Sequence, residues 1–148
     1  MRTIPPIASV LLLLLPGAVL AQQQAAEMPR TPAPEGAEVY IVSPEDGAEV
    51  SSPFTVRFGL RGMGIAPAGV QHPNTGHHHL LIDVDELPPE NQPLPTTDHV
   101  RHFGAGQTET ELDLPPGQHT LQLVLGDHLH IPHDPPVMSQ KITITVVE

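Results

Sequence analysis

The chain has 148 residues, enough for one domain of ordinary size, and its 17 acidic residues outnumber its 6 Lys and Arg, which gives a formal charge of −11. Nucleic acids and anionic membranes are themselves negatively charged, so this balance argues against both as partners and is compatible with cations. The chain has no cysteine, which excludes a disulfide framework and a thiolate nucleophile.

Residues 1–21 have the pattern of a signal peptide. Arg2 supplies a positive start, residues 7–15 form a nearly unbroken apolar run, and Val19-Leu20-Ala21 is a small-residue cleavage pattern. The apolar run is shorter than the roughly 20 residues that a membrane helix needs, and no later run approaches that length. We therefore expect cleavage near Ala21 and a periplasmic or secreted protein without a membrane span.

Residues 22–36 are rich in Gln, Ala and Pro and show no apolar period. Such composition is typical of a flexible tether. The folded domain is expected over residues 37–148.

Short apolar runs recur in this domain between turns rich in Pro and Gly. Several alternate with period two, as Leu121, Leu123 and Leu125 do, and 19 prolines leave no helical period. The runs of strand length are residues 38–42, 54–60, 78–84, 108–114, 119–126 and 141–147. The pattern predicts an all-β fold, an immunoglobulin-like antiparallel β-sandwich of six to eight short strands.

All ten histidines fall between His72 and His133, and two pairs have i, i+2 spacing. Side chains two apart on a strand share one face and lie about 6.5 to 7 Å apart, so such a pair can converge on one ion. Neutral imidazole is a good ligand for copper and zinc. The sequence predicts a copper or zinc ion bound by His77, His79, His128 and His130.

Other residues near these pairs could serve as further ligands or orient the imidazoles through their second ring nitrogen. They are His99, His102, His133, Asp83, Asp127 and Asp134. The alternative interpretation is a hydrogen-bonded loop network in a non-catalytic immunoglobulin-like module that binds a protein or cell-envelope partner.

No catalytic residue is predicted. The serines lie in no nucleophile-elbow context, and no glycine-rich loop is available for phosphates. A metal-dependent hydrolase or oxidase would require an open coordination position on the ion.

The motifs HHHLLID, HFGAGQTET, LPPGQHTLQL and HIPHDPPV, within residues 76–147, resemble those of an uncharacterised family of secreted bacterial domains. Residues 42–60 and 114–127 resemble segments of bacterial immunoglobulin-like domains, which implies that His119 takes the place of a corner tyrosine. The same two segments are similar to periplasmic copper-resistance sandwich proteins. Gln22 does not match the N-terminal histidine ligand of that family, and their Asp-x-His spacing is not reproduced.

Overall fold

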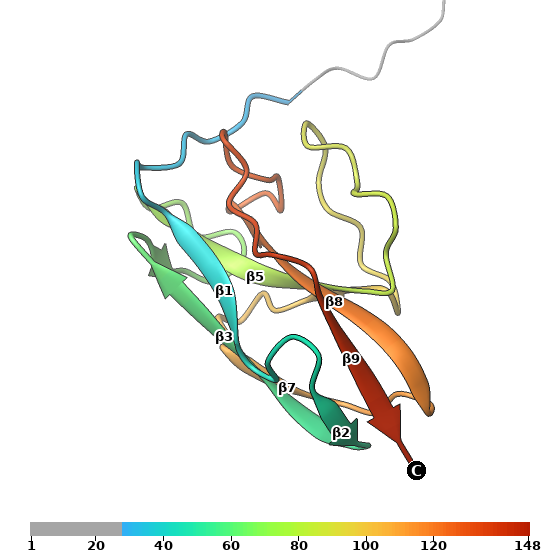
Figure 1. Cartoon of the computed structure of the whole chain (residues 1–148). Helices are drawn as coiled ribbons and strands as arrows, with labels where there is room; N and C mark the ends of the chain where they lie inside the picture. The colour runs from blue at the N-terminus through green and yellow to red at the C-terminus, as the bar shows by residue number, and fades with distance from the viewer. Residues whose placement is uncertain (1–27) are drawn as a thin grey trace, which may run out of the picture.

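The computed structural model describes residues 28–148, so the predicted signal peptide and residues 22–27 of the predicted tether lie outside the described residues. The described chain contains nine strands and no helix (Figure 1). In chain order they are β1 (Glu38–Ser43), β2 (Glu49–Ser51), β3 (Phe54–Arg61), β4 (Gly64–Ile65), β5 (Thr75–Ile82), β6 (Val100–His102), β7 (Glu109–Leu112), β8 (Gly117–Gly126) and β9 (Ile142–Val147). Over these same residues no helix could cross a membrane.

The strands form two sheets of a β-sandwich. One sheet has the order β1-β3-β7, and the other has the order β2-β9-β8-β5-β4, with β6 also paired to β5. Most pairs are antiparallel, but β2 runs parallel to β9 and β4 runs parallel to β5. The predicted all-β sandwich is therefore confirmed, with a mixed larger sheet in place of a purely antiparallel one.

The main core lies between the two sheets, where alternate side chains of β3 and β8 are buried. Val56, Leu121 and Leu123 have no exposed surface, as period-two patterning requires of strands packed on one face. A second, smaller apolar cluster contains Leu81, Leu94, Val100 and Val124. It lies on the opposite face of the larger sheet, because Leu81 and Leu80 are neighbours on β5 and point to opposite sides.

Each of the six predicted runs overlaps a strand, whereas β2, β4 and β6 were not predicted. These three have only two or three residues, too few to show a period in the sequence. They are strands because a longer neighbour supplies hydrogen-bond partners. Their existence therefore depends on the tertiary fold.

Part of the segment predicted to be a tether packs on the domain. Pro32 forms a bridge with Asp134, and the Ala33 amide donates to the Asp134 carbonyl over 2.9 Å. Figure 1 shows this stretch beside the loop that precedes β9. The segment from Arg30 to Ala33 is thus bound to the domain by specific hydrogen bonds.

Candidate metal centre

Strand β5 carries histidines on both of its faces. His77 and His79 project to one side, and His78 projects to the other, where its ring lies 5.1 Å from that of Phe58 in the main core. All three are at most 1% exposed, because β5 pairs with β8 on one edge and with β4 and β6 on the other. Because side chains alternate along β5, His78 lies in the main core, whereas His77 and His79 face away from the sandwich.

Four imidazoles converge on that outward face of β5. One ring nitrogen from each lies within 4.8 Å of those of the others, and the distances between ring centroids run from 4.6 to 5.9 Å. The four residues are His77, His79, His102 and His130, called here the histidine cluster. No other group of three or more His, Asp or Glu side chains in residues 28–148 has this geometry.

The histidine cluster leaves buried ring nitrogens without hydrogen-bond partners. His77 Nε2 and His130 Nδ1 are 3.1 Å apart and share one hydrogen bond. His77 Nδ1, both ring nitrogens of His79, and His102 Nε2 are buried and have no partner among the described residues. A buried polar atom without a partner costs about 1 to 3 kcal/mol, so such a group requires an explanation.

Burial also disfavours protonation of these imidazoles. It lowers the pKa of His77 to about 4 and that of His79 to about 3, and repulsion from the neighbouring rings adds to both shifts. The pKa of His102 is lowered for the same two reasons. These three side chains are therefore neutral at pH 7, which is the state in which imidazole binds a metal ion.

Two glycines make room for the rings. A Cβ on Gly104 would lie 2.2 Å from His102 Cε1, and a Cβ on Gly126 would lie 2.6 Å from His79 Cε1. Both distances are far below a normal contact, so any larger residue would displace an imidazole.

The distances between the ring nitrogens of the histidine cluster suit a bound ion as well as a hydrogen bond. Two nitrogens bound to one tetrahedral ion at 2.0 to 2.1 Å are about 3.3 Å apart, close to the 3.1 Å between His77 and His130. Inward movement of the half-exposed His102 and His130 would bring the other nitrogens to that separation. The donor set is entirely imidazole, without thiolate or thioether.

The prediction that His128 joins this group is corrected by the structure. Strand β8 ends at Gly126, and His130 has a φ of 67°, in the left-handed region. Side chains no longer alternate across such a turn, so His128 and His130 do not share a face. The fourth imidazole near His77, His79 and His130 is His102, which the sequence placed only among the further candidates.

The three candidate carboxylates lie outside hydrogen-bond distance of the histidine cluster. Asp83 pairs with His119, and the exposed Asp134 lies 3.6 Å from Arg30. Asp127 is buried and accepts hydrogen bonds from backbone amides and from Thr31. None of them accepts a hydrogen bond from a cluster imidazole in the described structure.

Two further candidate histidines have structural contacts. His99 Nδ1 donates to the Ile82 carbonyl over 2.9 Å, which ties the loop before β6 to the end of β5. His133 is fully buried. Its Nδ1 lies 3.4 Å from the Leu125 carbonyl oxygen, and its Nε2 lies 3.3 Å from the Thr75 carbonyl oxygen. Neither side chain belongs to the cluster.

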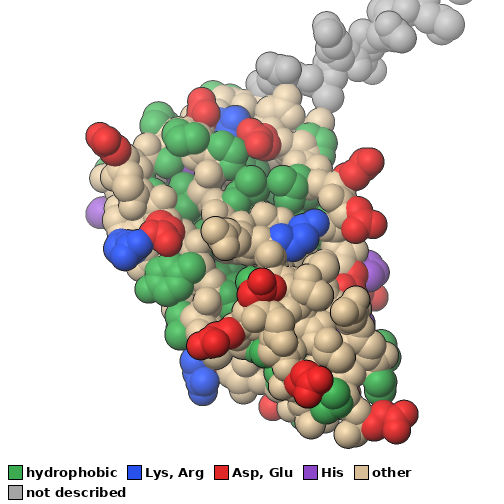
Figure 2. Space-filling model, viewed as in Figure 1, with side chains coloured by type: hydrophobic (Ala, Val, Ile, Leu, Met, Phe, Trp, Pro, Cys, Tyr) green, Lys and Arg blue, Asp and Glu red, His purple; other side chains and the backbone are tan. Residues whose placement is uncertain are grey.

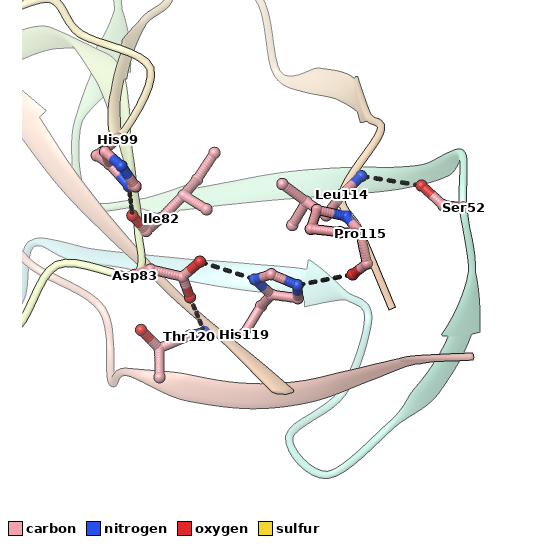
Figure 3. A network of polar contacts seen from close by, with 8 residues as sticks. All are labelled: Ser52, Ile82, Asp83, His99, Leu114, Pro115, His119 and Thr120. Atoms are coloured by element: carbon pink, nitrogen blue, oxygen red, sulfur yellow. Dashed lines mark hydrogen bonds and ion pairs between the residues drawn. The ribbon is translucent and has the colours of Figure 1, made fainter. Parts of the chain in front are cut away.

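His119 also has a structural environment, shown in Figure 3. Its Nδ1 donates to Asp83 over 2.7 Å, and its Nε2 donates to the Pro115 carbonyl over 2.9 Å. Asp83 also accepts a bond from the Thr120 amide. His119 therefore joins the end of β5 to the start of β8, and it is not a member of the histidine cluster.

One signal in the sequence points towards His102 but does not identify it by itself. Val100 and His102 alternate, and the structure places them on β6, where His102 is the partner of His79 and Val100 is the partner of Leu81. Cross-strand partners project to the same face of a sheet. Three residues are too few to reveal a strand without knowledge of the pairing.

The exterior has a different character from this site. On the face drawn in Figure 2, acidic side chains are scattered over the surface and histidine is visible only at the edges. On this face the acidic side chains are dispersed, and the net negative charge of the protein favours the approach of cations.

The fold and this site define a β-sandwich with a buried group of four histidines on the outer face of its larger sheet. The model of a family described as a domain of unknown function (DUF4399) matches residues 56–147, which include the entire histidine cluster. The chain belongs to this family. No curated protein and no solved structure matches the chain.

Proposed function

We propose that this protein is an exported β-sandwich that binds a divalent transition metal through His77, His79, His102 and His130. The observation that carries the proposal is the convergence of four imidazoles, three of which have unpartnered buried nitrogens. A bound ion would accept one lone pair from each ring and so relieve part of the cost of leaving these nitrogens unpaired. The alternative, a module whose histidines form a loop network, gives no partner to these atoms.

The donor set favours copper(II) and zinc among the common metals. Both accept neutral imidazole, and copper(II) lies above zinc in the usual order of affinities. Copper(I) prefers sulfur ligands, yet the partly buried Met63 and Met138 pack against the two apolar clusters. We therefore expect tight binding of copper(II) and weaker binding of zinc.

The proposed role is sequestration, delivery or sensing of the metal in the periplasm or outside the cell. The signal-peptide pattern of residues 1–21 supports export. Two members of the cluster are fully buried and two are partly buried, so an ion would be largely enclosed by the protein. Four protein ligands complete a tetrahedral shell, which supports binding over catalysis.

The test compares His102 with His128. The sequence alone predicts His128 as a ligand and His102 only as a further candidate, whereas the structure places His102 in the cluster and leaves His128 out. His102→Ala removes a cluster member and is expected to weaken copper(II) binding at least about a hundredfold, because an incomplete shell remains. His128→Ala is the matched control, since His128 lies in the same loop as His130 but outside the cluster. Affinity is measured by chelator competition on protein purified without a histidine tag.

Equal affinity of both variants and the unaltered protein would reject the assignment. Absence of copper and zinc binding by the unaltered protein would favour the partner-binding module.

A further inference from the structure

His130 is the cluster member that does not lie on a strand. Its φ of 67° is a conformation that costs a residue with a side chain about 1 to 2 kcal/mol. The turn is maintained by Asp127, whose Oδ1 accepts bonds from the amides of Leu129 at 2.8 Å and Ile131 at 3.0 Å. The His130 amide donates to the Asp127 carbonyl over 2.9 Å. Asp127 therefore determines where the His130 imidazole lies.

The Asp127 carboxylate is in turn positioned by the N-terminal segment. Asp127 is 2% exposed, and its second oxygen, Oδ2, accepts a hydrogen bond from the Thr31 hydroxyl over 2.7 Å. A hydrogen bond to a buried charge is among the stronger ones, and its loss leaves an unsatisfied oxygen.

Arg30 binds the same loop further along. Its guanidinium donates to the carbonyls of Pro132 and His133, and it pairs with Glu90 at 2.9 Å. The backbone of this segment adds two bonds of 2.9 Å, from the Ala33 amide to the Asp134 carbonyl and from the Asp134 amide to the Thr31 carbonyl. The N-terminal segment is thus hydrogen-bonded along the stretch that follows His130.

We propose that Thr31 and Arg30 are positioning residues for the metal site, and that docking of residues 30–33 is coupled to metal binding. This inference rests on the proposed function. Removing the segment frees the 127–134 loop and moves His130 away from His77. Coupling is reciprocal, so metal binding also stabilises the docked segment.

The first experiment measures copper(II) affinity in two variants of Thr31. Thr31→Val keeps the shape and removes the hydroxyl, and it is expected to weaken binding about tenfold or more, the size of effect that a lost bond to a charged group produces. Thr31→Ser keeps the hydroxyl and should bind within about twofold of the unaltered protein. Thr55→Val, on the exposed side of β3 in the other sheet, controls for the substitution itself.

A spectroscopic measurement separates positioning from general stability. Electron paramagnetic resonance of the copper(II) protein should show fewer coordinated nitrogens in Thr31→Val than in Thr31→Ser, because His130 no longer reaches the ion. Equal affinity and equal nitrogen coordination in the two variants would overturn the coupling.

The second experiment uses the unaltered protein and so does not depend on a variant that folds. Hydrogen exchange at the amides of Ala33 and Asp134 should slow when copper(II) or zinc is added, whereas the remote Arg57 amide should change less. If the protein binds metal and the exchange at Ala33 and Asp134 does not slow, the coupling is wrong. If the unaltered protein binds no metal, the proposed function fails first.

Discussion

His102 occupies its position only because residue 104 has no side chain. The ring lies across Gly104 and is half exposed, whereas His77 and His79 are fully enclosed. His102 is the less enclosed of these ligands, so a change beside it can displace its ring more easily than it could displace the enclosed pair. Metal affinity at this site therefore depends on small residues that bind nothing themselves.

Gly104→Ala should separate metal affinity from stability. The added Cβ would lie 2.2 Å from His102 Cε1, so the ring must swing outward and leave the cluster. We expect copper(II) affinity to fall at least about tenfold, with a destabilisation of the metal-free protein of about 1 kcal/mol, the lower end of the usual range, because the added methyl group mainly meets the end of a side chain that can move. Chelator competition and urea unfolding measure the two quantities.

Gly64→Ala is the control, because its Cβ would meet only Thr75 Cγ2, at 3.4 Å. Unchanged affinity in Gly104→Ala would show that His102 does not bind the ion.

At the level of strands, a group of polar contacts, called here the polar junction, joins the end of β5 to the start of β8, in addition to the backbone hydrogen bonds between the two strands. Asp83 follows β5 with a φ of 54°, and its carboxylate receives bonds from the His119 ring and the Thr120 amide of β8. Both ring nitrogens of His119 face oxygen acceptors, so the charged imidazolium fits the junction best. A tyrosine at this position has one hydroxyl proton and could serve only one of the two acceptors.

The junction predicts a pH dependence for the metal-free protein. Burial lowers the pKa of His119, but the hydrogen bonds to Asp83 and Pro115 and the charge of Asp83 outweigh it, and the net pKa is raised above 6.5. The stability from charged His119 is therefore fully present below the unfolded-state pKa and is lost as pH rises through the higher folded value. His119→Gln should cost about 1 kcal/mol or more near pH 6 and clearly less near pH 9.

Urea unfolding at several pH values checks this prediction. His72→Gln, which removes an exposed histidine, provides the comparison. A cost of His119→Gln that grows with pH would contradict the assigned charge.

On the scale of the whole molecule, a bound ion would connect segments far apart in the chain. His77 and His79 lie on β5, His102 lies on β6, and His130 lies in the loop after β8. An ion bound by all three segments stabilises the folded state, since the unfolded chain has no preformed site. The smaller apolar cluster lies on the same face of the sheet, so metal and apolar contacts support the same loops.

Added copper(II) should raise the melting temperature of the whole protein. An ion at about a thousand times its dissociation constant contributes about 4 kcal/mol, which corresponds to roughly 10 to 20 °C for a domain of this size. Because the pKa values of His77 and His79 are about 4 and 3 in the fold, these two ligands stay neutral and able to bind the ion at about pH 5. The metal-dependent difference should persist at about pH 5 and shrink as the pH falls through about 4, well below the ordinary pKa of histidine.

Paired melting curves with and without copper(II) test this. Superimposable curves at pH 7 would contradict metal binding, and loss of the difference already near pH 6 would contradict the expected persistence at about pH 5.

The sequence by itself determined the all-β class, because period-two apolar patterning and abundant proline are local properties of the chain. It also determined that His77 and His79 share a face, since a strand of eight residues keeps its alternation along its length. Tertiary structure decided the rest of the site. His102 joined the cluster through the register between β5 and β6, and His128 was left out because the turn after Gly126 breaks the alternation. Register and turn geometry depend on contacts between residues distant in the chain, and such contacts leave no period in the local sequence.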